Sequence, residues 1–170
     1  MAQALEISYL ADHPEFIDAL APAIYEHWRH ILTEETVEVR RTALMRHLNR
    51  DALPIAWVAH TESRVLGTAA LRESDLPGRE DLMPWLGGVF VLPEFRGRDI
   101  GKVLCVAVEK HASRLFNFKT LYLFTLDRQR WYEEMQWRML EPCQWRGRSG
   151  DIMCKDLRAA RQRFRADEER

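Results

Sequence analysis

Residues 89–104 read VFVLPEFRGRDIGKVL, and this stretch predicts the centre of the fold. A short apolar run stops at Pro93, and two arginines and two glycines then follow within residues 96–101. Because a helical pattern starts at once, the stretch predicts a strand, a tight loop and the start of a helix. The first N–H groups of a helix have no partner inside it, and the helix dipole adds partial positive charge there. We therefore expect this loop to bind an anion, with Arg96 and Arg98 as charged donors beside it.

The spacing of Gly97 and Gly101 separates this loop from two common nucleotide motifs. A P-loop has four residues between its glycines and a Ser or Thr after its lysine, whereas here three residues separate the glycines and Val103 follows Lys102. The sequence contains no GxGxxG dinucleotide fingerprint. We expect both glycines to let the chain turn tightly and to let a ligand approach the backbone, as in a cradle for a pyrophosphate.

Hydrophobic spacing on both sides of the loop predicts alternating helices and strands. Strands are expected at 5–10, 55–60, 64–72, 84–92, 121–126, 137–145 and 150–157, and helices from residue 14, around 37–48, over 100–115 and over 127–135. The strand–helix–strand order in the middle of the chain predicts one parallel, right-handed crossover, and the hairpins supply antiparallel neighbours. The predicted fold class is mixed α/β with a largely antiparallel sheet.

Three local features carry predictions of their own. Pro22 lies inside the first helix and is expected to kink or split it, because proline lacks an N–H and clashes with the preceding turn. Asp127 is placed to cap the short helix after the strand at 121–126. RGRSG at 146–150 is expected to be the turn between the last two strands.

Composition narrows the possible classes of function. The chain has 170 residues, which fits one domain, with 25 Lys and Arg against 26 Asp and Glu. This balance gives no overall field that favours nucleic acid or a membrane. The start of the chain does not have the pattern of a signal peptide, and the apolar runs are too short to span a bilayer.

The cysteines and the other possible metal ligands are scattered. Cys105, Cys143 and Cys154 form no CxxC pair, which argues against a disulfide framework and favours a reducing, cytoplasmic environment. We interpret them as small apolar fillers. No grouping of His, Cys, Asp and Glu has zinc-ligand spacing, so no metal is expected.

The run from Arg96 to Gly101 resembles motif A of the GNAT superfamily of N-acetyltransferases, whose core is Arg/Gln-x-x-Gly-x-Gly/Ala. The stretch LYLFTLDRQRWYEEMQW at 121–137 is similar to a second part of that family, in which an apolar strand leads into a short helix carrying an aromatic–Tyr pair. Together the likeness covers about residues 5–157 and is strongest over 84–137.

This resemblance implies a fold and a set of site residues. It implies one acetyltransferase-like domain over 1–157 with a charged tail over 158–170, and a mixed sheet with a central parallel strand pair flanked by about four helices. The implied catalytic acid, which protonates the departing CoA sulfur, is Tyr132; the alternative is that its ring only packs the helix against the sheet. The residues implied to bind acetyl-CoA are Val89, Phe90, Val91, Arg96, Gly97, Arg98, Asp99, Ile100, Gly101 and Lys102. Of these, Val91 is the expected backbone donor to the oxyanion.

Two residues depart from the family pattern. Asp99 stands where the family has its first motif glycine, and Gln136 stands where a glycine follows the aromatic–Tyr pair. Asp99 either caps the helix with its side chain turned aside or weakens cofactor binding through its charge. Trp131, beside the tyrosine, is expected to be a core residue.

The candidates for the general base lie in the acidic loop that precedes the strand expected at 84–92. Glu73 is the candidate because it follows directly from a strand end, in a cluster with Asp75, Glu80 and Asp81. The alternative is that this cluster is a solvated polar loop. His60 is a weaker candidate, expected to be a packing histidine instead. The resemblance places Tyr25, Trp28 and Arg29 near the acceptor, although they are equally well explained as ordinary helix-face residues.

The resemblance implies direct transfer of an acetyl group from acetyl-CoA to a primary amine of a small molecule. The alternative is a non-catalytic acyl-CoA-binding sensor or interaction module of the same fold, which Asp99 and Gln136 favour. Nucleic acid and membrane are not expected partners, and a monomer and a homodimer are both compatible with the sequence.

Overall fold

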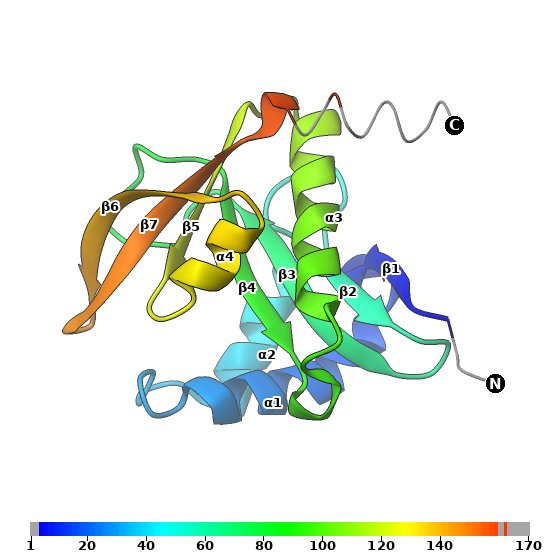
Figure 1. Ribbon diagram of the computed structural model, residues 1–170. Helices are drawn as coiled ribbons and strands as arrows, with labels where there is room; N and C mark the ends of the chain where they lie inside the picture. The colour runs from blue at the N-terminus through cyan, green and yellow to red at the C-terminus, as the bar shows by residue number, and fades with distance from the viewer. Residues whose placement is uncertain (1–3, 160–161, 163–170) are drawn as a thin grey trace. The chain divides into compact units, whose positions relative to one another are not determined.

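The structure is a computed structural model that describes residues 4–159 and 162 (Figure 1). Its strands are β1 Glu6–Tyr9, β2 Ile55–His60, β3 Val65–Arg72, β4 Trp85–Val91, β5 Thr120–Thr125, β6 Arg138–Trp145 and β7 Arg148–Asp156. Its helices are α1 Ile17–Trp28, α2 Val37–Met45, α3 Ile100–Arg114 and α4 Gln129–Glu134, with 3-10 turns at Leu10–Asp12, Pro14–Phe16 and Pro93–Phe95.

The strands form a sheet in the order β1-β2-β3-β4-β5-β7-β6. β4 and β5 pair in parallel at Trp85 and Tyr122, whereas the pairs β1–β2, β5–β7 and β6–β7 are antiparallel. The predicted fold class, mixed α/β with a largely antiparallel sheet and one central parallel pair, is therefore confirmed. Contacts divide the chain into two compact units, the first comprising residues up to Ala70 with Gly88–Cys105, and the second Leu71–Gly87 with residues from Val106 onward.

The first unit is built around α1 and α2, which pack against each other (Figure 1). The inner side of α1 buries Leu20, Ala21 and Ile24 in one apolar cluster with Val58 of β2. α2 begins where the hydroxyl of Thr36 accepts a hydrogen bond from the backbone N–H of Val39 at 3.2 Å. This cap satisfies one of the donors left over at a helix start.

Pro22 was expected to kink or to split the first helix, and the split is wrong. Pro22 does not split α1, which continues from Ile17 to Trp28 with the proline on its exposed side. Burial of the apolar stripe outweighs the local cost of proline, which would otherwise end a helix. On α2, Leu44 is buried, whereas Met45 is 55% exposed.

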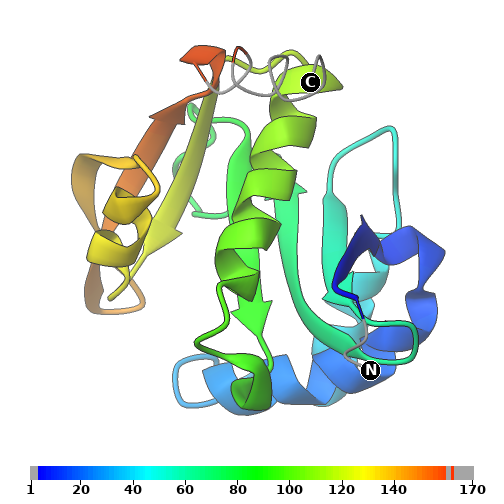
Figure 2. The same cartoon turned by 45° about the vertical axis from the view of Figure 1, so that its right-hand side comes forward.

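The second unit contains β5, the hairpin of β6 and β7, and α4 (Figure 2). β5 alternates, with Leu121 and Leu123 buried and Tyr122 and Phe124 only partly so. On the partly buried face, these two aromatic side chains join Trp85 and Ile152 in a second apolar cluster.

The turns of this unit differ in detail from the prediction. The β6–β7 connection is a two-residue turn of Arg146 and Gly147, with φ of +48° and +74°, because β7 already starts at Arg148. Positive φ at both central residues is the geometry that matches the twist of a tight hairpin. Asp127 does not cap α4; Arg128 is the cap residue, and its N–H donates to the hydroxyl of Thr125 at 3.0 Å.

Among residues 4–159 and 162, no helix has the length and apolarity needed to cross a bilayer. The three cysteines, all within the described residues, form no disulfide, and Cys105 and Cys154 are buried. Most of the tail predicted over 158–170 lies outside the described residues.

Candidate functional site

The end of β4 directs one edge of its backbone away from β3. The N–H of Leu92 donates to the backbone oxygen of Leu66 on β3 at 2.9 Å. Successive N–H groups along a strand point to opposite edges, so the N–H of Val91 points to the other edge of β4. This is the residue expected to donate to an oxyanion, and its N–H has the orientation that an external acceptor requires.

Arg96 is fixed against the end of β4. Its Nε donates to the backbone oxygen of Val91 at 3.0 Å, and its guanidinium carbon lies 5.6 Å from the centre of the Phe90 ring. The hydrogen bond and the cation–π contact hold the guanidinium beside the strand. The first residue of the motif is thereby held in place by the strand that precedes it.

The loop turns through left-handed backbone at two residues. Gly97 has φ of +76° and Asp99 has φ of +58°. An added Cβ at Gly97 would meet nothing within 4 Å, so the space outside this residue is open. Asp99 therefore adopts the conformation that usually requires glycine, and aspartate is one of the few other residues that tolerate it.

The carboxylate of Asp99 faces solvent. Its side chain is 80% exposed, and its Oδ1 lies 3.7 Å from Nζ of Lys102. The backbone oxygen of Asp99 accepts the Val103 N–H at 3.1 Å, as a residue at the start of a helix does. Of the two alternatives for Asp99, the side chain turned aside fits the structure, although its left-handed backbone differs from the extended one typical of a helix cap.

Gly101 does not form part of the turn, contrary to expectation. It is the second residue of α3, and its φ is not among the positive values. The turn is completed two residues earlier, at Asp99. Gly101 can therefore contribute to the site only by having no side chain in the first turn of α3.

Two arginine side chains lie over the ring of Phe95, which precedes the loop. The guanidinium groups of Arg64 and Arg98 lie 4.6 and 5.7 Å from the centre of the Phe95 ring, and Arg64 donates to Glu94 at 2.8 Å. Sequence reasoning missed Arg64, because the turn between β2 and β3 comes 30 residues before Glu94 along the chain.

Tyr132 lies in the last turns of α4 and is 8% exposed. The helix ends in a Schellman motif: the N–H of Trp137 donates to the oxygen of Tyr132 at 3.1 Å, and that of Gln136 to the oxygen of Glu133 at 2.9 Å. Gln136 holds the left-handed position of this motif, with φ of +67°. Both departures from the family pattern, Asp99 and Gln136, thus occupy backbone positions that favour glycine.

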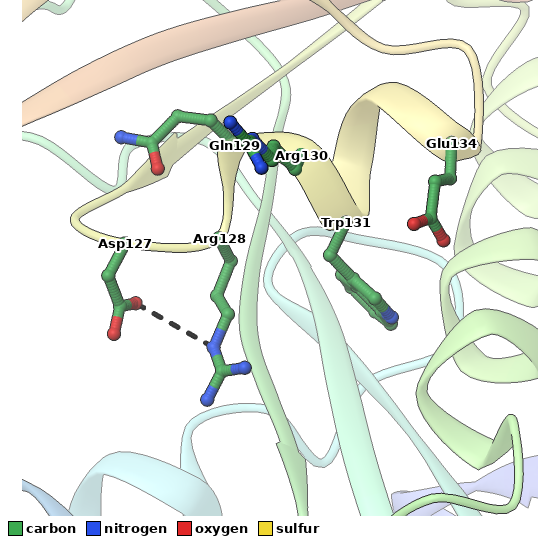
Figure 3. Close-up of a pocket in the computed structure, with 6 residues that line it drawn as sticks. All are labelled: Asp127, Arg128, Gln129, Arg130, Trp131 and Glu134. Carbon is green, nitrogen blue, oxygen red and sulfur yellow. Dashed lines mark ion pairs between the residues drawn. The ribbon is translucent and has the colours of Figure 1, made fainter.

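Trp131 is not the core residue that the sequence predicted. It is half-buried, its ring meets that of Tyr132 edge-on at 4.8 Å, and the buried indole of this region belongs to Trp137, which is 2% exposed. Figure 3 shows Trp131 and Arg128 on the same side of the α4 segment. They line a hollow of about 420 Å³ with Asp127, Gln129, Arg130 and Glu134. The lining combines two cations with two anions, so its charge selects for neither sign.

Two of the four carboxylates in the acidic cluster before β4 are in ion pairs. Asp75 binds Arg72, and Arg79 binds both Asp81 and Glu141. Glu73 follows the end of β3, is exposed, and has no ion pair or hydrogen bond within the part of the chain that the structure describes. Its carboxylate is therefore available to an external cation.

His60 fits the expectation of a packing histidine. It is 3% exposed, its Nε2 lies 2.9 Å from the hydroxyl of Ser8, and its Nδ1 lies 2.8 Å from the oxygen of Thr61. With both ring nitrogens hydrogen-bonded, the ring is held as part of the core.

Of the residues expected near the acceptor, Tyr25 and Trp28 are half-buried on α1, and Arg29 pairs with Glu26 at 3.1 Å. His27 also lies on α1, where helical spacing groups it with the apolar stripe. Its ring is exposed and lies 5.6 Å from that of Phe90.

The structure groups the candidate residues in two sets. The first unit holds all the residues implied to bind acetyl-CoA, from Val89 to Lys102, in one strand–loop–helix segment. The second unit holds Glu73 and Tyr132. Among residues 4–159 and 162, no three His, Cys, Asp or Glu side chains group as metal ligands would.

Comparisons with known proteins identify a family and a shared fold. The Acetyltransferase (GNAT) family matches residues 21–136. An aminoglycoside 6'-acetyltransferase type Ii is similar at a TM-score of 0.68 and 20% identity, covering 89% of this chain and 97% of that one. An aminoglycoside 6'-N-acetyltransferase complexed with coenzyme A is similar at a TM-score of 0.69 and 17% identity, again covering 89% of this chain and 97% of that one. An acetyltransferase from Streptococcus agalactiae is similar at a TM-score of 0.65 and 20% identity, covering 91% of this chain and 99% of that one. At these identities the structures show a shared fold, and no curated protein matched the sequence.

Proposed function

The chain belongs to the acetyltransferase (GNAT) family, and from that premise we propose that it transfers an acetyl group from acetyl-CoA to a primary amine of a small acceptor. The observation that carries the proposal is the left-handed turn through Gly97 and Asp99 at the start of α3. This turn leads the chain into a 15-residue helix whose first N–H groups face outward, as anion-binding helix starts do.

The residues of the loop fit the pyrophosphate of acetyl-CoA. Open space lies outside Gly97, the Asp99 carboxylate points to solvent, and Arg96 and Arg98 lie beside the turn. Acetyl-CoA supplies the acetyl group as an activated thioester. A structural neighbour solved with coenzyme A supports this assignment by analogy of fold.

Val91 and Tyr132 have the two remaining roles toward the thioester. The Val91 N–H, on the edge of β4 opposite β3, donates to the carbonyl oxygen as negative charge develops there. Tyr132 gives its proton to the departing sulfur. A thiol has a pKa of about 8.5 and a phenol one of about 10, so a phenol can hydrogen-bond the developing thiolate and protonate it late.

Glu73 is proposed to receive the amine. An ammonium must lose a proton before it can attack, and the exposed carboxylate at the end of β3 can attract the cation and accept that proton, directly or through water. The amine then attacks directly, with no covalent enzyme intermediate.

The first test is binding. Calorimetry with acetyl-CoA and with free CoA should give uptake at one site per chain, and both ligands should raise the unfolding midpoint. Absence of uptake would refute the proposal. A screen of amines for CoA release follows; uptake of acetyl-CoA without turnover of any amine would favour the alternative, an acyl-CoA sensor.

The thiol assay needs a blank without amine, because the protein has thiols of its own. Cys105 and Cys154 are buried, and Cys143 is partly exposed. Burial raises the pKa of the Cys143 thiol, and the charges of Asp151 and Glu141 add to this effect. The protein background near neutral pH should therefore be small, since the thiolate is the reactive form.

A further inference from the structure

A buried ion pair lies behind the end of α4. Nζ of Lys155, on β7, donates to Oε2 of Glu109, on α3, at 2.8 Å. The two side chains are 10% and 2% exposed. None of the roles proposed for the reaction uses either residue, although buried charges are retained only where they are paired and hydrogen-bonded.

Lys155 also binds the last turn of the helix that carries Tyr132. Its Nζ donates to the backbone oxygen of Met135 at 2.7 Å and lies 6.0 Å from the centre of the Trp137 ring. Met135 is the C-cap of α4, where unpaired carbonyls and the helix dipole favour a cation. A helix of six residues is too short to be stable alone, so it depends on such contacts.

Glu109 reaches Tyr132 through one further side chain. Its Oε1 accepts from Nε1 of Trp137 at 3.2 Å, which fixes the plane of the buried indole. The Trp137 ring meets the Tyr132 ring nearly edge-on, at 6.1 Å between centres and 69° between planes. The pair therefore contacts the tyrosine segment twice, at the helix end through Met135 and at the ring through Trp137.

The chemistry of this ion pair favours a role in orienting neighbouring groups over a role in stabilising the fold. A buried ion pair is often no more stabilising than apolar residues of the same size, because both charges lose their water. A buried ion pair does, however, make directional hydrogen bonds, and its charged donors and acceptors fix the positions of their partners.

We propose that Glu109 and Lys155 are positioning residues that hold the Tyr132 side chain in its working orientation. This inference rests on the proposed role of Tyr132 as the acid.

The test uses the double variant Glu109→Gln with Lys155→Met in the full chain. A single substitution would leave one buried charge unpaired and is expected to unfold the protein, whereas the double variant removes both charges. The control is Asp156→Asn with Arg158→Gln, which removes an exposed ion pair from the end of the same strand.

The expected result is a loss specific to Tyr132. The double variant should lower kcat by about fivefold or more, with KM for acetyl-CoA unchanged within about twofold. In a Tyr132→Phe background, the same double variant should change kcat by less than about twofold, because coupled residues are not additive. An equal fall of kcat in both backgrounds, or no fall in either, would overturn the inference.

Hydrogen exchange gives a readout that needs no turnover. The backbone N–H groups of Gln136 and Trp137 should exchange about tenfold faster in the double variant than in the control, because their hydrogen bonds close the end of α4. Unchanged exchange would overturn the inference. If the wild-type protein acetylates no amine, the proposed function fails, and exchange still decides whether the pair holds this helix.

Discussion

Arg96 donates from Nε to the backbone oxygen of Val91 at 3.0 Å, which ties the first residue of the loop motif to the strand end proposed to hold the acetyl group. The same side chain lies over the Phe90 ring. Within residues 4–159 and 162, its two terminal nitrogens have no hydrogen bond, so they are available to phosphate oxygens. One guanidinium can therefore couple the position of the strand to that of the pyrophosphate.

Arg96→Lys should weaken acetyl-CoA use even though the charge is kept. Lysine cannot donate to Val91 and to a phosphate with the geometry of a fork, and losing one charge-assisted hydrogen bond costs about 1.5–3 kcal/mol. We expect kcat/KM for acetyl-CoA to fall about tenfold or more, measured by initial rates. Arg41→Lys on α2, whose side chain pairs with Asp18, is the matched control. A full rate in Arg96→Lys would contradict the assigned role.

Asp99→Gly should tighten acetyl-CoA binding. The substitution removes a carboxylate near the proposed pyrophosphate site, and it removes a Cβ that would crowd the approach of a ligand to the loop backbone. Asp99→Asn separates the two effects, because it removes the charge and keeps a residue that tolerates positive φ. Calorimetry should rank the dissociation constants as Gly below Asn below Asp. Equal affinity in all three would mean that the exposed carboxylate has no influence on the ligand.

Tyr132→Phe should lower turnover and leave acetyl-CoA affinity unchanged. Phenylalanine keeps the edge-on contact with Trp137 and removes only the hydroxyl. Loss of a general acid typically costs about 10²–10⁴-fold in rate. The control is Tyr122→Phe on β5, whose ring packs on Trp85 at 6.0 Å. Single-turnover rates and calorimetry decide the point, and an unchanged rate would remove Tyr132 from the mechanism.

Gln136→Gly should stabilise the protein. Gln136 occupies the left-handed position of the Schellman motif with φ of +67°, where glycine has no steric cost. After allowance for the greater freedom of glycine in the unfolded chain, the expected gain is about 0.5–1 kcal/mol. Gln136→Val should destabilise by more than this. Urea unfolding measures both, and a loss of stability in Gln136→Gly would show that the glutamine side chain outweighs the backbone term.

Stability should fall in mild acid in part through His111. Burial lowers the pKa of this histidine below its ordinary 6.5, and the charges of Lys110 and Arg114 lower it further, against a hydrogen bond to Ala107 that raises it. The folded state therefore takes up its proton at lower pH than the unfolded chain does. The contribution is complete above about pH 6.5 and is lost as pH falls from there through the folded pKa.

His111→Gln should flatten this dependence. The glutamine amide can still donate to the Ala107 oxygen, but it does not titrate. Comparing urea unfolding at about pH 7.5 and about pH 5.5 should show a smaller loss of stability in the variant than in the wild type. An equal loss in both would assign the acid sensitivity to other groups.

Spacing along the chain determined most of the secondary structure. The apolar run before Pro93, the arginines and the helical stripe after Asp99 lie within one stretch, so β4, the loop and α3 could be predicted from local signals. The residues that cap helices and form turns were harder to predict from the sequence than the strands and helices themselves. Asp127 looked like a cap and Gly101 looked like a turn glycine, but neighbouring residues took both roles.

Which of two adjacent aromatic residues is buried was decided by the tertiary structure. Trp131 and Tyr132 have equally apolar neighbours in sequence, and only the packing of Trp137 against Tyr132 places one inward and the other at the surface. Helical spacing gives a face, but the element that covers that face comes from elsewhere in the chain.

The sequence alone determined a strand, a tight loop and a helix in that order, because hydrophobic period and backbone freedom are local properties. The fold decided which side chains meet. Glu109 and Lys155 stand 46 residues apart and pair only because the sheet brings β7 behind α3, and Arg64 reaches Glu94 only through the β2–β3 turn. Contacts between residues far apart in the chain depend on how helices and strands pack, and the hydrophobic periodicity of a sequence contains no information on that packing.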